Sequence, residues 1–205
     1  SIDRIFAFQL IRDITDQLAA RIVALQPAGR RGFESFAPSV SEQFFDQLQE
    51  NGRDGMPLFQ PLSRVQARLP PEKAASFAGG LSIALGQPGW RRVWIALDAD
   101  GAIAGHIDLR ARPDPLSTHR ALLGMGVHRA YRRCGLGRML VDTALAWAYA
   151  TPMLDWVDLD VLSGNHAARR LYQRAGFVVT GEEPDLYRID GESHGSVSMT
   201  RRIRV

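Results

Sequence analysis

One stretch, residues 124–141, constrains the fold more than any other part of this 205-residue chain, because it joins a strand pattern directly to a helix pattern. The apolar run 121–127 predicts a strand, and from Leu136 onward apolar side chains recur at helical spacing. Gly135 and Gly137 stand at the junction, where they permit close approach of a ligand to the backbone. Because the first amides of a helix have no intrahelical partner, the junction predicts an anion site built from backbone N–H groups.

The side chains around this turn are basic, and four arginines belong to it: Arg129, Arg132, Arg133 and Arg138. Two well-known phosphate loops do not match. The pattern Gly-x-x-x-x-Gly-Lys-Ser/Thr is absent, and Gly135-Leu-Gly137 lacks the third glycine of the dinucleotide-binding fingerprint. On this motif alone, an ordinary strand-to-helix turn with solvated arginines remains an alternative.

A second block, 159–177, follows about thirty residues later. It contains Leu-x-Val, an asparagine, Ala-x-x-Leu-Tyr and Gly-Phe in that order, at Leu159, Val161, Asn165, Ala168, Leu171, Tyr172, Gly176 and Phe177. Together with the spacing Arg132-x-x-Gly135-x-Gly137, this block resembles the GCN5-related N-acetyltransferase (GNAT) superfamily. The resemblance covers roughly residues 90–203 and is weak over the first ninety residues.

The resemblance and the order of the expected elements both imply an α+β fold, with a mixed, mostly antiparallel central sheet flanked by helices. We expect one domain over 1–205, in which 90–205 form the acetyl-CoA-binding core and 1–89 supply an N-terminal strand and helices on the substrate side. The N-terminal part is predicted as a strand at 4–12, a helix from about 15 through Leu25, a helix at 39–50, a loop at 51–71 and a helix from Pro71. The core is predicted as strands at 93–97, 103–109, 118–127 and 156–161, helices at 136–150 and 165–175, and a closing hairpin at 178–189 and 194–203.

The resemblance also implies an activity: direct transfer of an acetyl group from acetyl-CoA to a primary amine in a ternary complex. The amine could belong to a small molecule, a polyamine, a peptide N-terminus or a lysine. In this family the backbone around Met125 to Val127 pairs with the pantetheine arm, and the Val127 amide polarises the thioester carbonyl. The implied pyrophosphate site comprises Arg132, Arg133, Cys134, Gly135, Leu136, Gly137 and Arg138. Many relatives have glycine where this chain has Arg133 and proline where it has Arg129.

Two residues of the second block have a structural and a functional interpretation. Asn165 caps the helix that it opens, contacts the pantetheine arm, or does both. Tyr172 packs in the core at helical spacing, or it donates a proton to the departing thiolate, as the resemblance implies. The general base is not identified, because 119–127 contain no Asp or Glu. His119 is one candidate, and aspartates on neighbouring strands (Asp108, Asp158 and Asp160) are others. Deprotonation through water and capture of an amine that is already neutral also stay open.

Composition narrows the class of protein. The 25 basic and 22 acidic side chains leave a net charge of +3, and the densest basic run is the turn itself, which is not the pattern of a nucleic-acid reader. A single cysteine, Cys134, excludes an internal disulfide or a thiolate metal cluster, and we expect no metal. We interpret Cys134 as incidental rather than nucleophilic, although a helix start among arginines lowers a thiol pKa.

No apolar run approaches the roughly 20 residues of a membrane span, and no secretory leader pattern opens the sequence, so we expect a cytoplasmic protein. Its expected partners are acetyl-CoA and an amine, and a homodimer is compatible with the sequence. Two rivals remain: a non-catalytic acyl-CoA-binding module on the same fold, and a nucleic-acid-binding protein whose affinity would fall steeply with salt.

Overall fold

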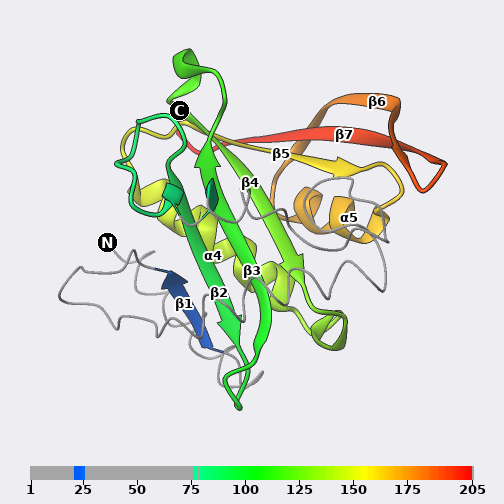
Figure 1. Ribbon diagram of the computed structural model, residues 1–205, viewed down its shortest axis with the longest axis horizontal. Coiled ribbons are helices and arrows are strands. Elements are labelled where there is room, and N and C mark those ends of the chain that lie inside the picture. The colour runs from blue at the N-terminus through cyan, green and yellow to red at the C-terminus, as the bar shows by residue number, and fades with distance from the viewer. Residues whose placement is uncertain (1–20, 26–75, 78, 205) are drawn as a thin grey trace.

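The computed structural model describes residues 21–25, 76–77 and 79–204, and these form a seven-stranded sheet in the order β1-β2-β3-β4-β5-β7-β6 (Figure 1). The strands are β1 Arg21–Leu25, β2 Arg91–Leu97, β3 Ile103–Ala111, β4 Arg120–Val127, β5 Trp156–Leu162, β6 Val178–Ile189 and β7 Glu192–Arg202. Only β4 and β5 pair in parallel, whereas the other neighbours are antiparallel. The predicted α+β class with a mixed, mostly antiparallel sheet is confirmed.

Beside the strands lie two helices and two short 3-10 turns, α4 Leu136–Ala150, α5 His166–Arg174, η1 Pro115–Ser117 and η2 Arg129–Tyr131, and residues 76–77 and 79–80 are also helical. The helices α4 and α5 lie close to their predicted bounds. Gly176 follows α5 with φ +83°, so the helix ends at a glycine in the left-handed conformation. The closing hairpin is also confirmed, and it turns at Asp190-Gly191, where both residues have positive φ. No helix in the described ranges is both long and apolar enough to cross a membrane.

The first described strand corrects one prediction. Residues up to Leu25 were expected to be helical, but Arg21–Leu25 form β1, which pairs antiparallel with β2 from Arg21↔Leu97 to Leu25↔Val93. The physical reason is that Ile22 and Val23 are β-branched, and pairing with β2 satisfies the backbone in the extended conformation. The predicted strand 4–12, the helix 39–50 and the loop 51–71 lie outside the described residues.

Helix α4 packs its apolar stripe against the sheet and contacts β2, β3 and β4. Leu140 and Ala144 have no exposed surface, and the half-buried Trp147 lies against the rings of Trp90 and Trp94. Tyr172 of α5 belongs to the same hydrophobic cluster, which also includes side chains of β5 and β7. One core therefore holds both helices on the sheet.

The parallel contact between β4 and β5 is short. It includes only Arg120–Leu122 of β4 against Trp156–Asp158 of β5, while β4 stays paired with β3 as far as Val127. Beyond that contact the two strands diverge, as Figure 1 shows. Among the described residues, 123–127 therefore have no strand partner on the β5 side.

Candidate functional site

Beyond Leu122 and Asp158 the strands β4 and β5 are not hydrogen-bonded to each other, and we call this unpaired part of the sheet the gap. The His128 N–H donates to the Ala104 carbonyl at 2.9 Å, on the β3 side. Because successive peptide groups of a strand point alternately to its two edges, the N–H and C=O groups of Val127 and Met125 point to the β5 side. The gap is therefore lined by polar backbone groups that could pair with an extended amide-bearing ligand.

The turn that follows β4 presents free backbone donors. Arg133 has φ +64° and Gly135 has φ +89°, and alternation of this kind turns successive N–H groups toward one concave side. The amides of residues 133–137 donate to no acceptor in the described part of the chain, because the first helical bonds run from Arg138 and Met139 to the Gly135 carbonyl. These amides lie at the start of the 15-residue helix α4, where the helix dipole favours an anion.

The two glycines of the turn have different roles. A Cβ on Gly135 would meet nothing within 4 Å, so glycine is required there by the left-handed backbone. A Cβ on Gly137 would lie 3.1 Å from Leu171 Cδ2 and 3.7 Å from Met125 Cε. The sequence predicts both glycines as sites of close ligand approach, and at Gly137 the missing Cβ also leaves room for Leu171 and Met125.

Several side chains of the turn are engaged within the protein. Arg132 Nε donates to the Val127 carbonyl at 3.1 Å, and Arg138 Nε donates to Asp142 Oδ2 at 2.8 Å. The exposed Cys134 thiol donates to the Tyr131 carbonyl at 2.8 Å. These bonds shape the turn, and they leave its main-chain donors as the prominent anion-binding groups.

A contact outside the turn helps to fix it. The Tyr131 hydroxyl of η2 donates a hydrogen bond to Asp98 Oδ2, in the turn between β2 and β3. This bond lowers the pKa of Asp98 and raises the pKa of Tyr131. It therefore ties the segment that leads into the turn to the neighbouring hairpin.

Tyr172 is buried on α5, with 6% of its surface exposed, and its ring packs edge-on against Phe177 at a centroid distance of 5.8 Å. Its hydroxyl makes no hydrogen bond with any described residue. Burial raises the pKa of Tyr172, and the Asp108 carboxylate raises it further. The side chain is thus a core tyrosine that also carries a proton-bearing group without a partner.

Asn165 caps α5: its Oδ1 accepts from the Ala168 N–H at 3.2 Å. The predicted capping role is confirmed. The Nδ2 group makes no hydrogen bond in the described part of the chain, so its donors remain available to a ligand.

His119 lies just before β4, eight residues from Val127, and its side chain is exposed. A strand of that length spans about 26 Å. The structure therefore does not bring His119 together with Val127 and the turn, and we do not retain it as a candidate base.

The aspartates on the neighbouring strands differ sharply in environment. Asp108 has no exposed surface, and it pairs with Arg91 and Arg110 at 3.0 Å each. Burial raises the pKa of Asp108 despite these guanidinium groups. Asp158 is also paired, whereas Asp160 is exposed and accepts a hydrogen bond from Ser198 Oγ at 2.6 Å.

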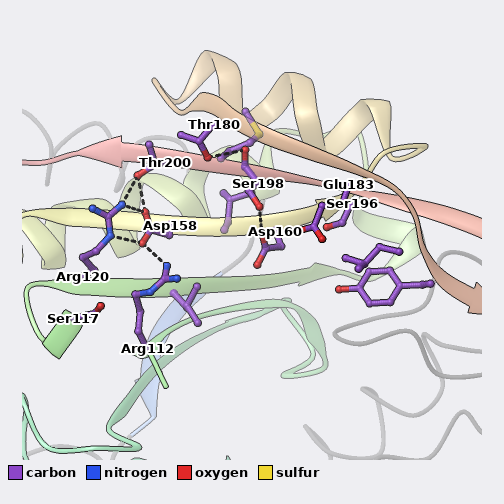
Figure 2. A pocket seen from close by; sticks show the side chains of 15 residues that line it. Arg112, Ser117, Arg120, Asp158, Asp160, Thr180, Glu183, Ser196, Ser198 and Thr200 are labelled. Atoms are coloured by element: carbon purple, nitrogen blue, oxygen red, sulfur yellow. Dashed lines mark hydrogen bonds and ion pairs between the residues drawn. The ribbon is translucent and has the colours of Figure 1, made fainter. Parts of the chain in front are cut away.

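Asp158 and Asp160 lie in a cavity of about 510 Å³. Val157, Leu159 and Val161 belong to the core beneath the helices, so the alternating aspartates face the opposite side of the sheet. Figure 2 shows Arg112 and Arg120 around Asp158 at one end of this cavity, and Glu183 with Ser196 at the other. Asp160 lies between the two ends (Figure 2).

The model of the acetyltransferase (GNAT) family matches residues 66–177, which is more than half of the chain. The chain belongs to the GNAT family. The resemblance inferred from the turn and the 159–177 block is thereby confirmed.

Among curated relatives, this GNAT protein is similar to the N-alpha-acetyltransferase daf-31 of Caenorhabditis elegans, with 32% identity over 101 residues. The match covers 48% of this chain and 55% of the relative, so the chain spans about half the length of the relative that it matches.

Solved structures share the fold of this GNAT protein. The acetyltransferase of GNAT family from Streptococcus pneumoniae has a TM-score of 0.72 at 22% identity, over 89% of this chain and 99% of that one. Arabidopsis thaliana NAA60, solved in complex with a bisubstrate analogue, has a TM-score of 0.61 at 18% identity, over 89% and 98% of the two chains. At these identities the likeness establishes the fold alone.

Sequence reasoning missed the two arginines of the cavity and the Tyr131–Asp98 contact of this GNAT protein. A signal for Arg120 existed, because it lies in the predicted strand 118–127, and Asp158-x-Asp160 places two carboxylates on one face of the predicted strand 156–161. Such alternation on interior strands indicates a polar cavity rather than a covered face. The Tyr131–Asp98 contact left no comparable local signal, because it joins two turns 33 residues apart.

Proposed function

We propose that this GNAT protein transfers the acetyl group of acetyl-CoA to a primary amine, by direct attack within a ternary complex. The observation that carries the proposal is the gap between β4 and β5, into which Met125 directs its N–H and C=O groups and Val127 its N–H, none of which is bonded to a described residue, while the Val127 carbonyl accepts from Arg132. A turn with five free amides lies at the end of that gap. An extended, amide-bearing chain that ends in a pyrophosphate matches this arrangement.

The residues present fit acetyl-CoA in chemical type. Met125 and Val127 can pair with the amides of a pantetheine arm as a neighbouring strand would. The amides of 133–137 offer donors to a pyrophosphate, with Arg132, Arg133 and Arg138 adding positive charge. The free Nδ2 donors of Asn165 can reach an amide carbonyl of the same arm. When bound, acetyl-CoA supplies an acetyl thioester.

Two groups are assigned to the transfer itself. The Val127 N–H points into the gap, where it can donate to the thioester oxygen as negative charge develops. The Tyr172 hydroxyl has no hydrogen-bond partner among the described residues, and we assign it as the acid that protonates the departing sulfur. The raised pKa of Tyr172 keeps that proton in place throughout the neutral range.

Asp160 is the carboxylate that we assign to the amine. Asp108 and Asp158 are both ion-paired with arginines, whereas Asp160 lies exposed in the cavity and bonds only to Ser198 among the described residues. An exposed, unpaired carboxylate can hold an ammonium group and accept its proton. Asp160 is therefore our proposed general base, which the sequence alone does not identify.

An amine panel tests the proposal: alkylamines, polyamines and amino-terminal peptides are each incubated with acetyl-CoA, and release of free thiol is measured. We expect release that depends on the amine and is lost in Asp160→Asn. Binding of CoA without thiol release for any amine would overturn the transferase proposal and leave the non-catalytic acyl-CoA-binding module. Absence of CoA binding would overturn the site assignment as well.

A further inference from the structure

The cavity has a regular floor. Three side-chain pairs lie on one face of β5, β7 and β6, each pair directly opposite in register: Asp158 with Thr200, Asp160 with Ser198, and Glu183 with Ser196. Because these pairs follow one another at every second residue of β7, they form three successive polar rungs. The charge on the rungs changes from one end to the other.

The first rung carries surplus positive charge. Arg120 contacts both oxygens of Asp158, with Nε at 2.7 Å from Oδ2, and Arg112 Nη1 contacts the same oxygen at 2.7 Å. Thr200 Oγ1 also donates to Asp158. Burial opposes ionisation of Asp158, but the bonds from Arg120 and Thr200 outweigh it and hold the pKa of that carboxyl below its ordinary value. Two guanidinium groups thus face one ionised carboxylate, and the excess is one positive charge.

The two arginines differ in how many of their N–H groups are already hydrogen-bonded. Arg120 is held by both carboxylate oxygens, by Thr200 and by the Trp156 ring, 4.8 Å from its guanidinium carbon. Arg112 makes one hydrogen bond in the described part of the chain, and its side chain is 36% exposed. Since a guanidinium carries five N–H donors, Arg112 has several left for an anion in the cavity.

The other two rungs carry negative charge. Neither Asp160 nor Glu183 has an ion pair within the described ranges, and Ser198 is the described donor to Asp160. Arg112 and Arg120 are the only basic side chains among the described residues that line the cavity. The cavity is therefore dipolar, with a cationic and an anionic end.

We propose that the acceptor is itself dipolar: its amine lies against Asp160 and Glu183, and a carboxylate lies against Arg112. This inference rests on the proposed transferase function and adds the substrate class. Asp160 lies one rung, about 6.6 Å, from Asp158 along β5, so an amine at Asp160 and a carboxylate at Arg112 are separated by about 7 Å or more. That span excludes the α-amine and α-carboxylate of one amino acid, and it suits an ω-amino acid or an N-terminal peptide with an acidic side chain nearby.

The acidic residues alone would also fit a polyamine. A second ammonium group on such a substrate would lie at the Arg112 end, where it would meet the surplus positive charge rather than a counter-ion. The charge distribution therefore favours one amine and one anion over two amines.

Three acceptors of equal chain length test this: ε-aminocaproate, hexylamine and hexamethylenediamine. Each has six carbons, and they differ only in the last one with its substituents, which is a carboxylate, a methyl or an aminomethyl group. We expect kcat/KM for ε-aminocaproate to exceed that for either other acceptor at least about tenfold, which is the effect of one good charge-assisted hydrogen bond. A second arm compares the dipeptide amides Ala-Glu and Ala-Gln, and it distinguishes a peptide acceptor from a free ω-amino acid.

Arg112→Gln provides the matched variant. It should bring the ratio of kcat/KM for ε-aminocaproate over hexylamine close to one, because the anion loses its partner while the neutral chain does not. Arg170→Gln, an exposed arginine of α5 outside the cavity, should keep the wild-type ratio. Should Arg112→Gln fail to fold, the wild-type comparison of the three acceptors decides alone.

The outcomes separate the two proposals. No thiol release with any acceptor would overturn the transferase function. Release at equal kcat/KM for ε-aminocaproate and hexylamine, or a preference for the diamine, would overturn the dipolar acceptor and leave the transferase standing. Discrimination that persists in Arg112→Gln would overturn the assignment of Arg112 to the anion.

Discussion

At the scale of single residues, Tyr172 combines two features that separate its packing from its chemistry. The ring packs against Phe177, and the hydroxyl has no partner among the described residues. Tyr172→Phe keeps the packing of the ring and removes only the hydroxyl, so we expect kcat to fall about 10²-fold while acetyl-CoA affinity changes no more than a few-fold. Steady-state kinetics and calorimetry measure the two quantities separately.

The pH profile strengthens this test. Because burial and Asp108 raise the pKa of Tyr172, the hydroxyl keeps its proton up to alkaline pH, and the wild-type rate should decline only above the ordinary tyrosine value of about 10. The variant should lack that decline. Wild-type turnover in Tyr172→Phe, measured where chemistry limits the rate, would leave the tyrosine as packing and the acid unassigned.

His106 predicts a pH dependence of stability rather than of rate. Burial, and next to it the charge of Arg91, lower its pKa to about 3, from an ordinary 6.5. Below pH 6.5 the unfolded chain binds the proton and the folded chain does not, so stability falls as pH decreases, by about 1.4 kcal/mol per pH unit for this group. The neighbouring Asp108, whose pKa is raised, acts in the opposite direction.

Urea unfolding at several values between about pH 7 and 5 checks this, with His106→Gln as the non-titrating comparison. The wild type should lose stability relative to the variant on acidification. Parallel pH profiles for the two proteins would show that His106 gains a proton as easily in the folded state as in the unfolded state.

At the scale of elements, the turn into α4 depends on its glycines for different reasons. Gly135→Ala forces a side chain into a left-handed backbone and should cost about 1–2 kcal/mol of stability. Gly137→Ala places a Cβ 3.1 Å from Leu171 Cδ2, so the Leu171 side chain or the start of α4 must move by a few tenths of an ångström. Both changes move the amides of 133–137, and we expect each to weaken acetyl-CoA binding at least about tenfold, as one lost charge-assisted bond would.

Gly164→Ala is the control for the glycine variants. Its Cβ would meet nothing within 4 Å, and its φ lies outside the left-handed region. Thermal unfolding and calorimetry of the three variants should leave Gly164→Ala near the wild type. Full acetyl-CoA affinity in folded Gly135→Ala and Gly137→Ala would remove the turn from the proposed pyrophosphate site.

At the scale of the whole molecule, the sequence predicts what is local and misses what depends on distant pairing. The strands and helices of the C-terminal half follow from periodicity, caps and glycine stops such as Asn165 and Gly176. The strand Arg21–Leu25 does not, because its conformation comes from pairing with β2 some seventy residues away. A five-residue segment is too short for its own periodicity to decide between helix and strand.

The candidate site likewise has parts that the sequence predicts and parts that it does not. The turn and the cap at Asn165 are each formed by residues that are close together in the sequence, so the sequence identifies them. The charge distribution of the cavity depends on the register of β4, β5, β7 and β6 and on the position of Arg112 just after β3. No single segment of the sequence reveals either. His119 is a poor candidate for the same reason. A histidine can act as a base, but this one lies just before β4, at the end of the strand far from Val127.

The contact between β4 and β5 is the short one in the sheet, and we call it the seam. Three residue pairs join β4 to β5, so the two halves of the sheet share few main-chain bonds at the gap. A ligand that pairs with β4 and reaches Asn165 would bridge this seam, and at about 100 times its Kd it would stabilise the folded state by about 2.7 kcal/mol. Hydrogen exchange with saturating acetyl-CoA should therefore slow at 123–127 and 133–138, and also at 159–165 across the gap.

The tip of the closing hairpin, 188–192, provides the internal reference, because it lies at the far end of β6 and β7 and does not line the gap (Figure 1). Its exchange should not change when acetyl-CoA binds. Slowing at 133–138 alone would mean that the turn binds the pyrophosphate without the rest of the ligand entering the gap. In that case Val127 would not touch the thioester, and the proposed oxyanion donor would have to be sought elsewhere.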